Sequence, residues 1–501
     1  MVSSPFDAFI GEDTVPLFQE ATGSKKAGYL LWGDGVRRLG EQANGRVKVR
    51  ARGKDGWVKS GALDGESLLE VYFIDVGQGD GILIKTPDFR HIMIDGGHPR
   101  GQQNTGKSAA DFVDWKFCAD YGLEGISLDA MIASHNDFDH YGGLADLLDA
   151  EQEDELDATS VAIEAFYHAG VSWWVGPDGK RTLGPTTQSG PRSYLSQLLG
   201  DRASAVAATS GAGPQLQGEW KSFIAKVVAS RTATGGSTAV GRVGTSTGHL
   251  PGFAAAAGKA SVRVLGPVEH DIGGQKMLGV LSSDSKSTNG NSVLLRLDYG
   301  RSRILLTGDL NRESQDALLE FHAGNVLEFQ SDVAKSCHHG SEDVSFRFLQ
   351  AMNPAATVIS SGDGEGHDHP RPRIMAASGA TGHLTIQDDQ ILTPLVYATE
   401  LARSVSLGHP MAATVHAEQG SNTGDIELGP AALQRVELTY RETKPGDLNP
   451  RTRKRRLSGM KVVAGLIYGL VNVRTDGRTI LTATMNEGDG SFAVKKFPSR
   501  F

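Results

Sequence analysis

Four side chains of metal-binding type lie close together in the segment I-A-S-H-N-D-F-D-H-Y-G-G-L, residues 132–144. They are His135, Asp137, Asp139 and His140. Two carboxylates this close repel each other and lose hydration when buried, so the pair needs a cation. Imidazole and carboxylate ligands together suit zinc, manganese or iron. The segment therefore predicts a metal site.

The residues around this segment indicate how it is positioned. A short apolar run, residues 128–132, comes directly before it and is typical of a buried strand. A glycine pair, Gly142-Gly143, follows. Open α/β architectures place their sites at the carboxyl ends of strands, which is where these four side chains are expected. A solvated acidic turn after a strand is the alternative interpretation.

Further candidate side chains follow other predicted strands. Asp95 ends the run H-I-M-I-D-G-G, and Asp309 lies in L-L-T-G-D-L. An isolated aspartate at a strand end is usually a helix cap. Two histidines stand side by side in C-H-H-G-S, residues 337–341, and two more in G-H-D-H-P-R-P, residues 366–372. Neighbouring histidines point in different directions. One of each pair is therefore expected to bind a metal ion, and the other to contact the substrate or the protein scaffold.

Together these motifs carry a family resemblance. H-x-D-x-D-H followed by x-G-G resembles the metal motif of the metallo-β-lactamase superfamily, which in most members is H-x-H-x-D-H. Asp137 at the second position resembles the branch that contains the ComEC-type competence proteins. The stretches F-I-D-V-G-Q-G-D, I-D-G-G, L-L-T-G-D-L, H-H-G-S and His369-Pro370 extend the likeness. Competence proteins are membrane channels, so the resemblance is to their soluble nuclease-like domain.

The resemblance implies an α+β fold, a four-layer αββα sandwich, which holds two divalent transition-metal ions, zinc or manganese. His135 and Asp137 would hold the first ion, Asp139 and His140 the second, with Asp309 shared and His339 completing the set. The implied catalytic residues are Asp139, His140, Asp309 and His369. His168, at the end of the apolar run 161–167, is a possible further ligand, and His338 a ligand or substrate contact. Asp95 is expected to support the metal loop through hydrogen bonds. His367 is the alternative to His369 in its motif.

Phosphodiester substrates are likewise implied by the resemblance, and a nuclease acting on DNA or oligonucleotides is the predicted activity. Two basic stretches suit a phosphate backbone: Lys48, Arg50, Arg52 and Lys54, and the run Arg451–Arg456. A solvated surface is the plainer interpretation of each. The alternative function is hydrolysis of a small-molecule phosphodiester, ester or lactone, since the superfamily acts on many substrates.

A rival signal occurs at Gly101–Ser108, where G-Q-Q-N-T-G-K-S satisfies the phosphate-binding-loop pattern before a predicted helix, residues 109–121. D-G-G-H-P-R separates this loop from the preceding strand, which argues against a nucleotide-binding loop. Lys107 could still contact a substrate phosphate. A nucleotide binder therefore stays a minor alternative.

Composition limits the classes of protein that fit. The chain has 501 residues, a net charge of −9 and 39% hydrophobic residues, which is typical of a globular protein with two or three domains. Two cysteines, Cys118 and Cys337, make a disulfide framework unexpected and favour a reducing compartment. No signal peptide or membrane span is predicted, so we expect a cytoplasmic protein. The oligomeric state is left open.

Three regions are predicted along the chain. Residues 26–66 alternate in short segments between glycine turns, which indicates a small all-β unit that weakly resembles an SH3-like barrel. Residues 67–400 form the catalytic domain, with a Gly-, Ser-, Thr- and Ala-rich insertion at about 172–258 that we interpret as a lid or spacer. Within it, 232–258 is expected to be a flexible loop. Residues 401–501 are an extension whose last hairpin is expected to complete the catalytic sheet.

Overall fold

The computed structural model describes most of the chain. The described residues are 3–102, 108–149, 155–362, 369–387, 389–399, 404–408, 411–417, 424–433, 435–442, 451–456, 462–467, 470–486 and 490–501. They divide into two units, residues 1–402 with 468–501, and residues 403–467.

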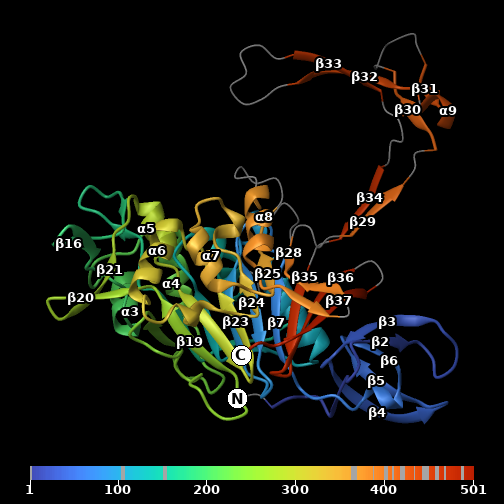
Figure 1. The fold of residues 1–501 in the computed structure, drawn as a ribbon, viewed down its shortest axis with the longest axis horizontal. Coiled ribbons are helices and arrows are strands. Elements are labelled where there is room, and N and C mark those ends of the chain that lie inside the picture. Colours follow the sequence, from blue (N-terminus) through green and yellow to red (C-terminus); the bar gives the residue numbers. More distant parts are fainter. Residues whose placement is uncertain are drawn as a thin grey trace. The chain divides into compact units, whose positions relative to one another are not determined.

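The first unit is built on two large sheets (Figure 1). The nine-stranded sheet runs, in spatial order, β18 (Ala239–Arg242), β13 (Ala165–His168), β11 (Ala130–Ala133), β9 (His91–Gly96), β8 (Gly81–Lys85), β7 (Leu69–Ile74), β35 (Leu470–Thr475), β36 (Thr479–Asn486) and β37 (Ser491–Pro498). The six-stranded sheet runs β19 (Ser261–Gly266), β22 (Leu294–Tyr299), β23 (Ser302–Leu306), β24 (Val333–Lys335), β25 (Ala356–Ile359) and β28 (Leu395–Ala398).

Helices cover the outer faces of both sheets. They are α1 (Ala109–Asp114), continued by a π-helical turn η3 (Trp115–Asp120), α2 (Phe138–Leu147), α3 (Arg202–Ser210), α4 (Gly218–Ala229), α5 (Asp284–Gly290), α6 (Arg312–Phe321), α7 (Phe346–Met352) and α8 (Pro372–Thr381). Short 3₁₀ turns are η1 (Ser60–Ala62), η2 (Arg100–Gln102), η5 (Val326–Phe329) and η6 (His338–Gly340). In Figure 1 the yellow and orange helices α6, α7 and α8 lie along the six-stranded sheet.

Three hydrophobic clusters fill the spaces between these layers. Side chains alternate along each strand, so in β7 Val71 and Phe73 face the other sheet while Tyr72 and Ile74 face the helices. One cluster lies under α1 to α4, one between the two sheets, and one under α6 to α8. Helix, sheet, sheet and helix therefore follow one another. The predicted α+β, four-layer αββα sandwich is confirmed.

The N-terminal residues form a separate antiparallel sheet of six strands. Its order is β1 (Ala8–Phe9), β4 (Gly35–Ala43), β5 (Arg46–Ala51), β6 (Lys54–Lys59), β2 (Thr14–Phe18) and β3 (Lys26–Leu31). The predicted boundary at residue 26 was too late, because β1 and β2 precede it. β1 has only two residues and β2 contains Pro16, so neither gives a clear strand signal.

A buried charge network joins this N-terminal sheet to the nine-stranded sheet. Asp34 accepts hydrogen bonds from Arg52, at 2.6 Å, and lies 2.7 Å from the Arg474 guanidinium on β35. Arg474 also donates to the Trp32 carbonyl at 2.6 Å. On β7 and β8, Glu70 and Lys85 form an ion pair of 2.6 Å. All of these charges are paired, as buried charges must be.

The interpretation of residues 172–258 as lid or spacer was wrong in part. Helix α4 places Trp220, Phe223 and Ile224 in the core, where the Phe223 ring stacks on Tyr141 of α2 at 5.1 Å between centroids. The expected flexible loop, 232–258, contains β18, an edge strand of the nine-stranded sheet. Small residues lowered the apparent hydrophobicity, whereas the helical spacing of those apolar positions carried the correct signal.

Smaller elements complete the first unit. They are the four-stranded sheet β16 (Thr186–Ser189), β17 (Arg192–Leu195), β21 (Gln275–Gly279) and β20 (Glu269–Ile272), and the pairs β10 (Ile126–Leu128) with β12 (Val161–Ile163), β14 (Trp174–Val175) with β15 (Arg181–Thr182), and β26 (Thr385–Gln387) with β27 (Gln390–Thr393). The second unit consists of paired strands and one short helix: β29 (Ser404–Gly408) with β34 (Val462–Ile467), β30 (Ala413–Val415) with β31 (Ile426–Leu428), β32 (Glu437–Glu442) with β33 (Arg451–Arg456), and α9 (Pro430–Leu433). Among the described residues, no helix has the length and apolar character needed to cross a membrane.

The buried network predicts a specific loss of stability in acid. Burial alone would raise the pKa of Glu70, but the charges of Arg474 and Lys85 outweigh it and lower that pKa to about 2. The stabilisation from Glu70 is therefore complete above the unfolded pKa of about 4.5 and is lost as the pH falls toward 2. We expect Glu70→Gln to cost about 3 kcal/mol at pH 7 and progressively less below pH 4.5. Urea unfolding at several pH values measures this, and a cost independent of pH contradicts it.

Candidate metal centre

The first half of the site is set by a close approach of helix α2 to strand β9. The amide of Gly143 donates to the Gly97 carbonyl at 3.0 Å. A Cβ atom on Gly143 would lie 2.1 Å from the Gly96 carbonyl oxygen, so only glycine fits. The glycine pairs of D-G-G and Y-G-G are thus packing requirements. They bring α2, which begins at Phe138, against the end of β9.

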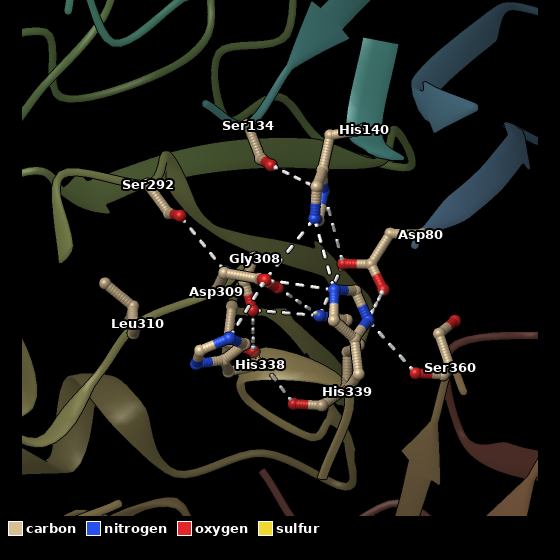
Figure 2. Close-up of polar contacts among 12 residues, drawn as sticks. Asp80, Ser134, His140, Ser292, Gly308, Asp309, Leu310, His338, His339 and Ser360 are labelled. Atoms are coloured by element: carbon tan, nitrogen blue, oxygen red, sulfur yellow. Dashed lines mark hydrogen bonds and ion pairs between the residues drawn. The ribbon is translucent and has the colours of Figure 1, made fainter. Parts of the chain in front are cut away.

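This approach orients His140, which is fully buried. Its Nδ1 atom donates to Asp95 Oδ2 at 2.9 Å, while Asp95 Oδ1 accepts from the amide of Ser134 at 2.7 Å. Asp95 therefore links helix α2 to Ser134, which follows strand β11. The opposite ring atom, Nε2, points toward Asp309 and His339 (Figure 2).

The second half of the site comes from the six-stranded sheet. Asp309 follows β23, and its amide donates to Ser292 Oγ at 3.0 Å. His339 lies in the turn η6, where it and His338 adopt left-handed backbone angles, φ 51° and 46°. His339 Nδ1 donates to the Ser360 carbonyl at 3.2 Å, which leaves Nε2 facing Asp309 Oδ2 at 2.9 Å.

The spacing of the converging atoms fits a metal. His140 Nε2 lies 3.2 Å from His339 Nε2 and 3.4 Å from Asp309 Oδ2. Ligands bonded at about 2.1 Å in a tetrahedron are separated by about 3.4 Å. His135 Nε2 is buried and has no hydrogen-bond partner among the described residues, although Asp137 Oδ2 lies 3.7 Å away. An orphaned imidazole nitrogen in a cluster of acids is the form that a ligand takes.

Among the described residues, four groups could each hold a metal ion, with donor atoms within 4.8 Å of one another. They are His135, His140 and Asp309; Asp139, His140 and His339; Asp80, Asp95 and His140; and Asp80, Asp309 and His339.

The pKa values of the site show how strongly its carboxylates favour positive charge nearby. Burial alone would lower the pKa of His339, but Asp309 and Asp80 outweigh burial and raise it to about 9. Burial opposes protonation of His140 in the same way, and Asp309, Asp95 and Asp139 raise its pKa above the ordinary value. Burial, followed by the charge of Asp139, raises the pKa of Asp137 to about 7.

Comparison with known proteins places this arrangement in a family. The model of the metallo-β-lactamase superfamily matches residues 74–362, which is more than half of the chain. The chain belongs to the metallo-β-lactamase superfamily. The matched residues contain both halves of the site, from β7 to the turn after β25.

Two curated proteins resemble parts of this metallo-β-lactamase domain. Competence protein ComA of Neisseria gonorrhoeae is 33% identical over 102 residues, which are 20% of this chain and 14% of that protein. ComE operon protein 3 of Bacillus subtilis (strain 168) is 31% identical over 94 residues, 18% of this chain and 12% of that protein. The likeness therefore spans a small part of each relative, and it confirms the ComEC-type resemblance.

Solved structures add little to this assignment. A mutant of CmlA β-hydroxylase aligns at a TM-score of 0.26 and 10% identity, over 59% of this chain and 46% of that one. A protein of unknown function from Enterococcus faecalis V583 aligns at 0.24 and 12%, over 57% and 56% of the two chains. Scores this low support no conclusion.

The metallo-β-lactamase fold usually binds two divalent metal ions, and members of the superfamily are generally metal-dependent hydrolases. The geometry above supplies the donors that such ions need. A cavity of about 690 Å³ opens over them. It is lined by Gln78, His98, Asp137, Phe138, Asp139, Ser285, Asn289, Asp309, His338, Ser341, Glu342, His369 and Arg371.

The sequence-predicted residues fall into different places around this cavity. His338 and His369 line its wall, and His338 Nε2 lies 3.8 Å from Asp309. His168 belongs to none of the four groups. Its Nδ1 accepts from the Gly170 amide at 3.2 Å, which leaves the ring proton on Nε2 and disfavours ligation through that atom. Lys107 and His367 lie outside the described residues; Ser108, last of the phosphate-loop pattern, caps α1.

Two buried residues of the site were missed by sequence reasoning, Asp80 and Lys335. Asp80 lies in the turn between β7 and β8, inside the G-Q-G-D stretch, and its carboxylate pairs with the Lys335 ammonium. A charged residue inside a glycine turn normally indicates solvent exposure. The signal available was Lys335 itself, a lysine at the end of the apolar run V-A-K.

The convergence on Asp309 predicts how much metal the protein holds. We expect purified protein to carry about two equivalents of transition metal, as two-metal hydrolases do. Asp309→Ala should lose much of it, because Asp309 belongs to two of the four ligand groups. Elemental analysis measures this, with the exposed Asp271→Ala as matched control. Absence of bound metal, together with no thermal shift in Mn²⁺ or Zn²⁺, removes the metal centre.

Proposed function

We propose that this protein is a two-metal phosphodiesterase that cleaves a nucleic-acid backbone. The observation that carries the proposal is the ligand set around Asp309, with Asp137 where most of the superfamily has histidine. That substitution is what the chain has in common with the competence-type branch. The name of one curated relative, Competence protein ComA, and its likeness in name to ComE operon protein 3 support a DNA-related role.

We assign the residues of the site as follows. His135 and Asp137 would hold the first ion, Asp139, His140 and His339 would hold the second, and Asp309 would contribute to both. Asp95 fixes the ring of His140 through the 2.9 Å hydrogen bond, and Gln78 donates to Asp139 Oδ2 at 3.1 Å. Such outer hydrogen bonds set which ring nitrogen carries the proton and which is left to bind.

Bound metal ions would supply Lewis acidity and a water of lowered pKa for attack at phosphorus. The residues of the cavity wall do the rest. His338, His369 and Arg371 line the cavity, where they could contact a substrate phosphate. Arg371 can bind a phosphate oxygen through two N–H groups, and His369 can donate a proton to the leaving oxygen.

The second unit supports a polyanionic substrate. In the hairpin of β32 and β33 the sequences E-L-T-Y-R-E and R-T-R-K-R-R contain six basic and two acidic residues. Arg453, Lys454 and Arg456 are exposed. Lys454 lies 3.5 Å from Glu437, and with six basic residues against two acidic ones the hairpin sequence keeps a net positive charge.

The N-terminal basic stretch no longer supports this role. Lys48 pairs with Glu41 at 2.6 Å, Arg50 with Asp55 at 3.1 Å and Arg52 with Asp34 at 2.6 Å. Lys54 donates to the Ala27 carbonyl at 3.1 Å. The positive charges of Lys48, Arg50 and Arg52 are thus matched by acidic partners on neighbouring segments. The spacing of basic residues along one strand did not reveal these partners.

A small-molecule phosphodiester is the second candidate substrate. The cavity volume of about 690 Å³ lies within the range of small-molecule sites. A nucleotide or a dinucleotide linkage would fill such a cavity. The two candidates share the metal centre and differ in whether the basic hairpin contributes to binding.

Asp139→Ala separates catalysis from binding. The substitution removes a carboxylate of the metal centre and leaves the basic hairpin unchanged. We expect metal-dependent cleavage of a labelled single-stranded oligonucleotide to fall by at least about 100-fold, with the binding constant within about twofold. Gel-based cleavage and fluorescence anisotropy measure the two quantities. A variant that retains cleavage contradicts the assignment of Asp139.

Neutralising the hairpin should have the opposite effect. Replacement of Arg453, Lys454, Arg455 and Arg456 by glutamine should raise KM for oligonucleotides and reduce the salt dependence of binding, with less effect on kcat. Lys48→Gln with Arg50→Gln is the matched control, because those charges are already paired. Hydrolysis of bis-p-nitrophenyl phosphate should be unchanged in both variants. Wild-type hydrolysis of this ester with no cleavage of any oligonucleotide would decide for the small-molecule substrate.

A further inference from the structure

Lys335 is a fully buried lysine in the wall of the metal centre. It ends strand β24 and has an exposed fraction of 0%. Its ammonium group pairs with Asp80, donates to the Gly308 carbonyl at 2.8 Å and lies 3.6 Å from Asp309 Oδ1. A charged amine can be buried this completely only where carboxylates and carbonyls surround it. None of the roles assigned above uses this cation.

The position of Lys335 distinguishes the two oxygens of Asp309. Oδ1 faces the ammonium group, whereas Oδ2 lies among three imidazoles, 2.9 Å from His339, 3.4 Å from His140 and 3.8 Å from His338. Rotation of the carboxylate out of this orientation would weaken its contact with Lys335. The Gly308 carbonyl, held by the same ammonium, fixes the backbone immediately before Asp309 (Figure 2).

Asp80 extends this control to His339. One Asp80 oxygen pairs with Lys335, and the other lies 3.4 Å from His339 Nδ1. His339 Nδ1 is therefore held by Asp80 and by the Ser360 carbonyl, and Nε2 is directed to the centre. Asp80 has the chemistry of a ligand and lies in two of the four candidate groups.

We propose that Lys335 is a positioning residue, which presents Asp309 Oδ2 directly, and His339 Nε2 through Asp80, to the metal ions. The inference rests on the proposed metal centre and not on nucleic acid as the substrate. A purely structural role, in which Lys335 only neutralises a buried aspartate, is the alternative that the experiment must separate.

The test compares Lys335→Met, Asp80→Asn and the double variant with wild type. Each is loaded with Co²⁺, and the visible absorption spectrum, the Co²⁺ dissociation constant and the kcat and KM for bis-p-nitrophenyl phosphate are measured. For Lys335→Met we expect an altered spectrum, Co²⁺ binding weakened by about tenfold or more, and kcat lowered by at least about tenfold with KM within about twofold. Surface variant Lys276→Met is the control and should match wild type.

The double variant decides between the two roles. Removal of both partners leaves no unpaired charge, so the double variant should fold even where Lys335→Met alone does not. If Lys335 positions the ligands, the double variant recovers thermal stability but keeps the altered Co²⁺ spectrum and the low kcat. Recovery of the wild-type spectrum and kcat overturns the inference, and so does an unchanged spectrum in Lys335→Met. Failure of wild type to bind Co²⁺ is a distinct result, which removes the proposed function itself.

Discussion

The crowding of carboxylates where the two sheets meet is the constraint on which the rest of the site depends. Asp80, Asp95, Asp139 and Asp309 approach a single buried pair of imidazoles, His140 and His339. Charges this close cannot stay buried without cations, so each carboxylate is matched by a donor that the fold supplies. Three features of the fold meet this requirement separately. They are the glycine contacts between α2 and β9, the left-handed turn at His339 and the buried Lys335.

Sequence reasoning found the parts of the site that lie in contiguous motifs. His135 to His140, Asp309 and His339 follow apolar runs, and residues at strand ends can be recognised without knowledge of their partners. Asp80 and Lys335 were missed because the role of each depends on its ion pair with the other, and the two residues lie in different halves of the chain. Their pairing is a property of how the two sheets are stacked, which no local pattern encodes.

The fold class followed from the same motifs, whereas the details did not. The four layers were correctly predicted, but the helices α3 and α4 were taken for a loose insertion because the segment that contains them, residues 172–258, is rich in small residues. Likewise, the basic face of the N-terminal sheet looked unpaired in the sequence. Its acidic partners, Glu41, Asp55 and Asp34, come from neighbouring segments whose register only the structure shows.

The pairing of β7 with β35 has a consequence for how the protein is made. Asn472 on β35 donates to the Val71 carbonyl on β7 across 401 positions of sequence. Until the ribosome has delivered β35, β7 is the outermost strand on its side of the sheet, with backbone groups unpaired and apolar side chains uncovered. Strands this far apart in the sequence pair late, because the chain loses the entropy of loop closure before any stabilising contact forms. The edge of β7 therefore stays open to pairing with another chain for most of synthesis.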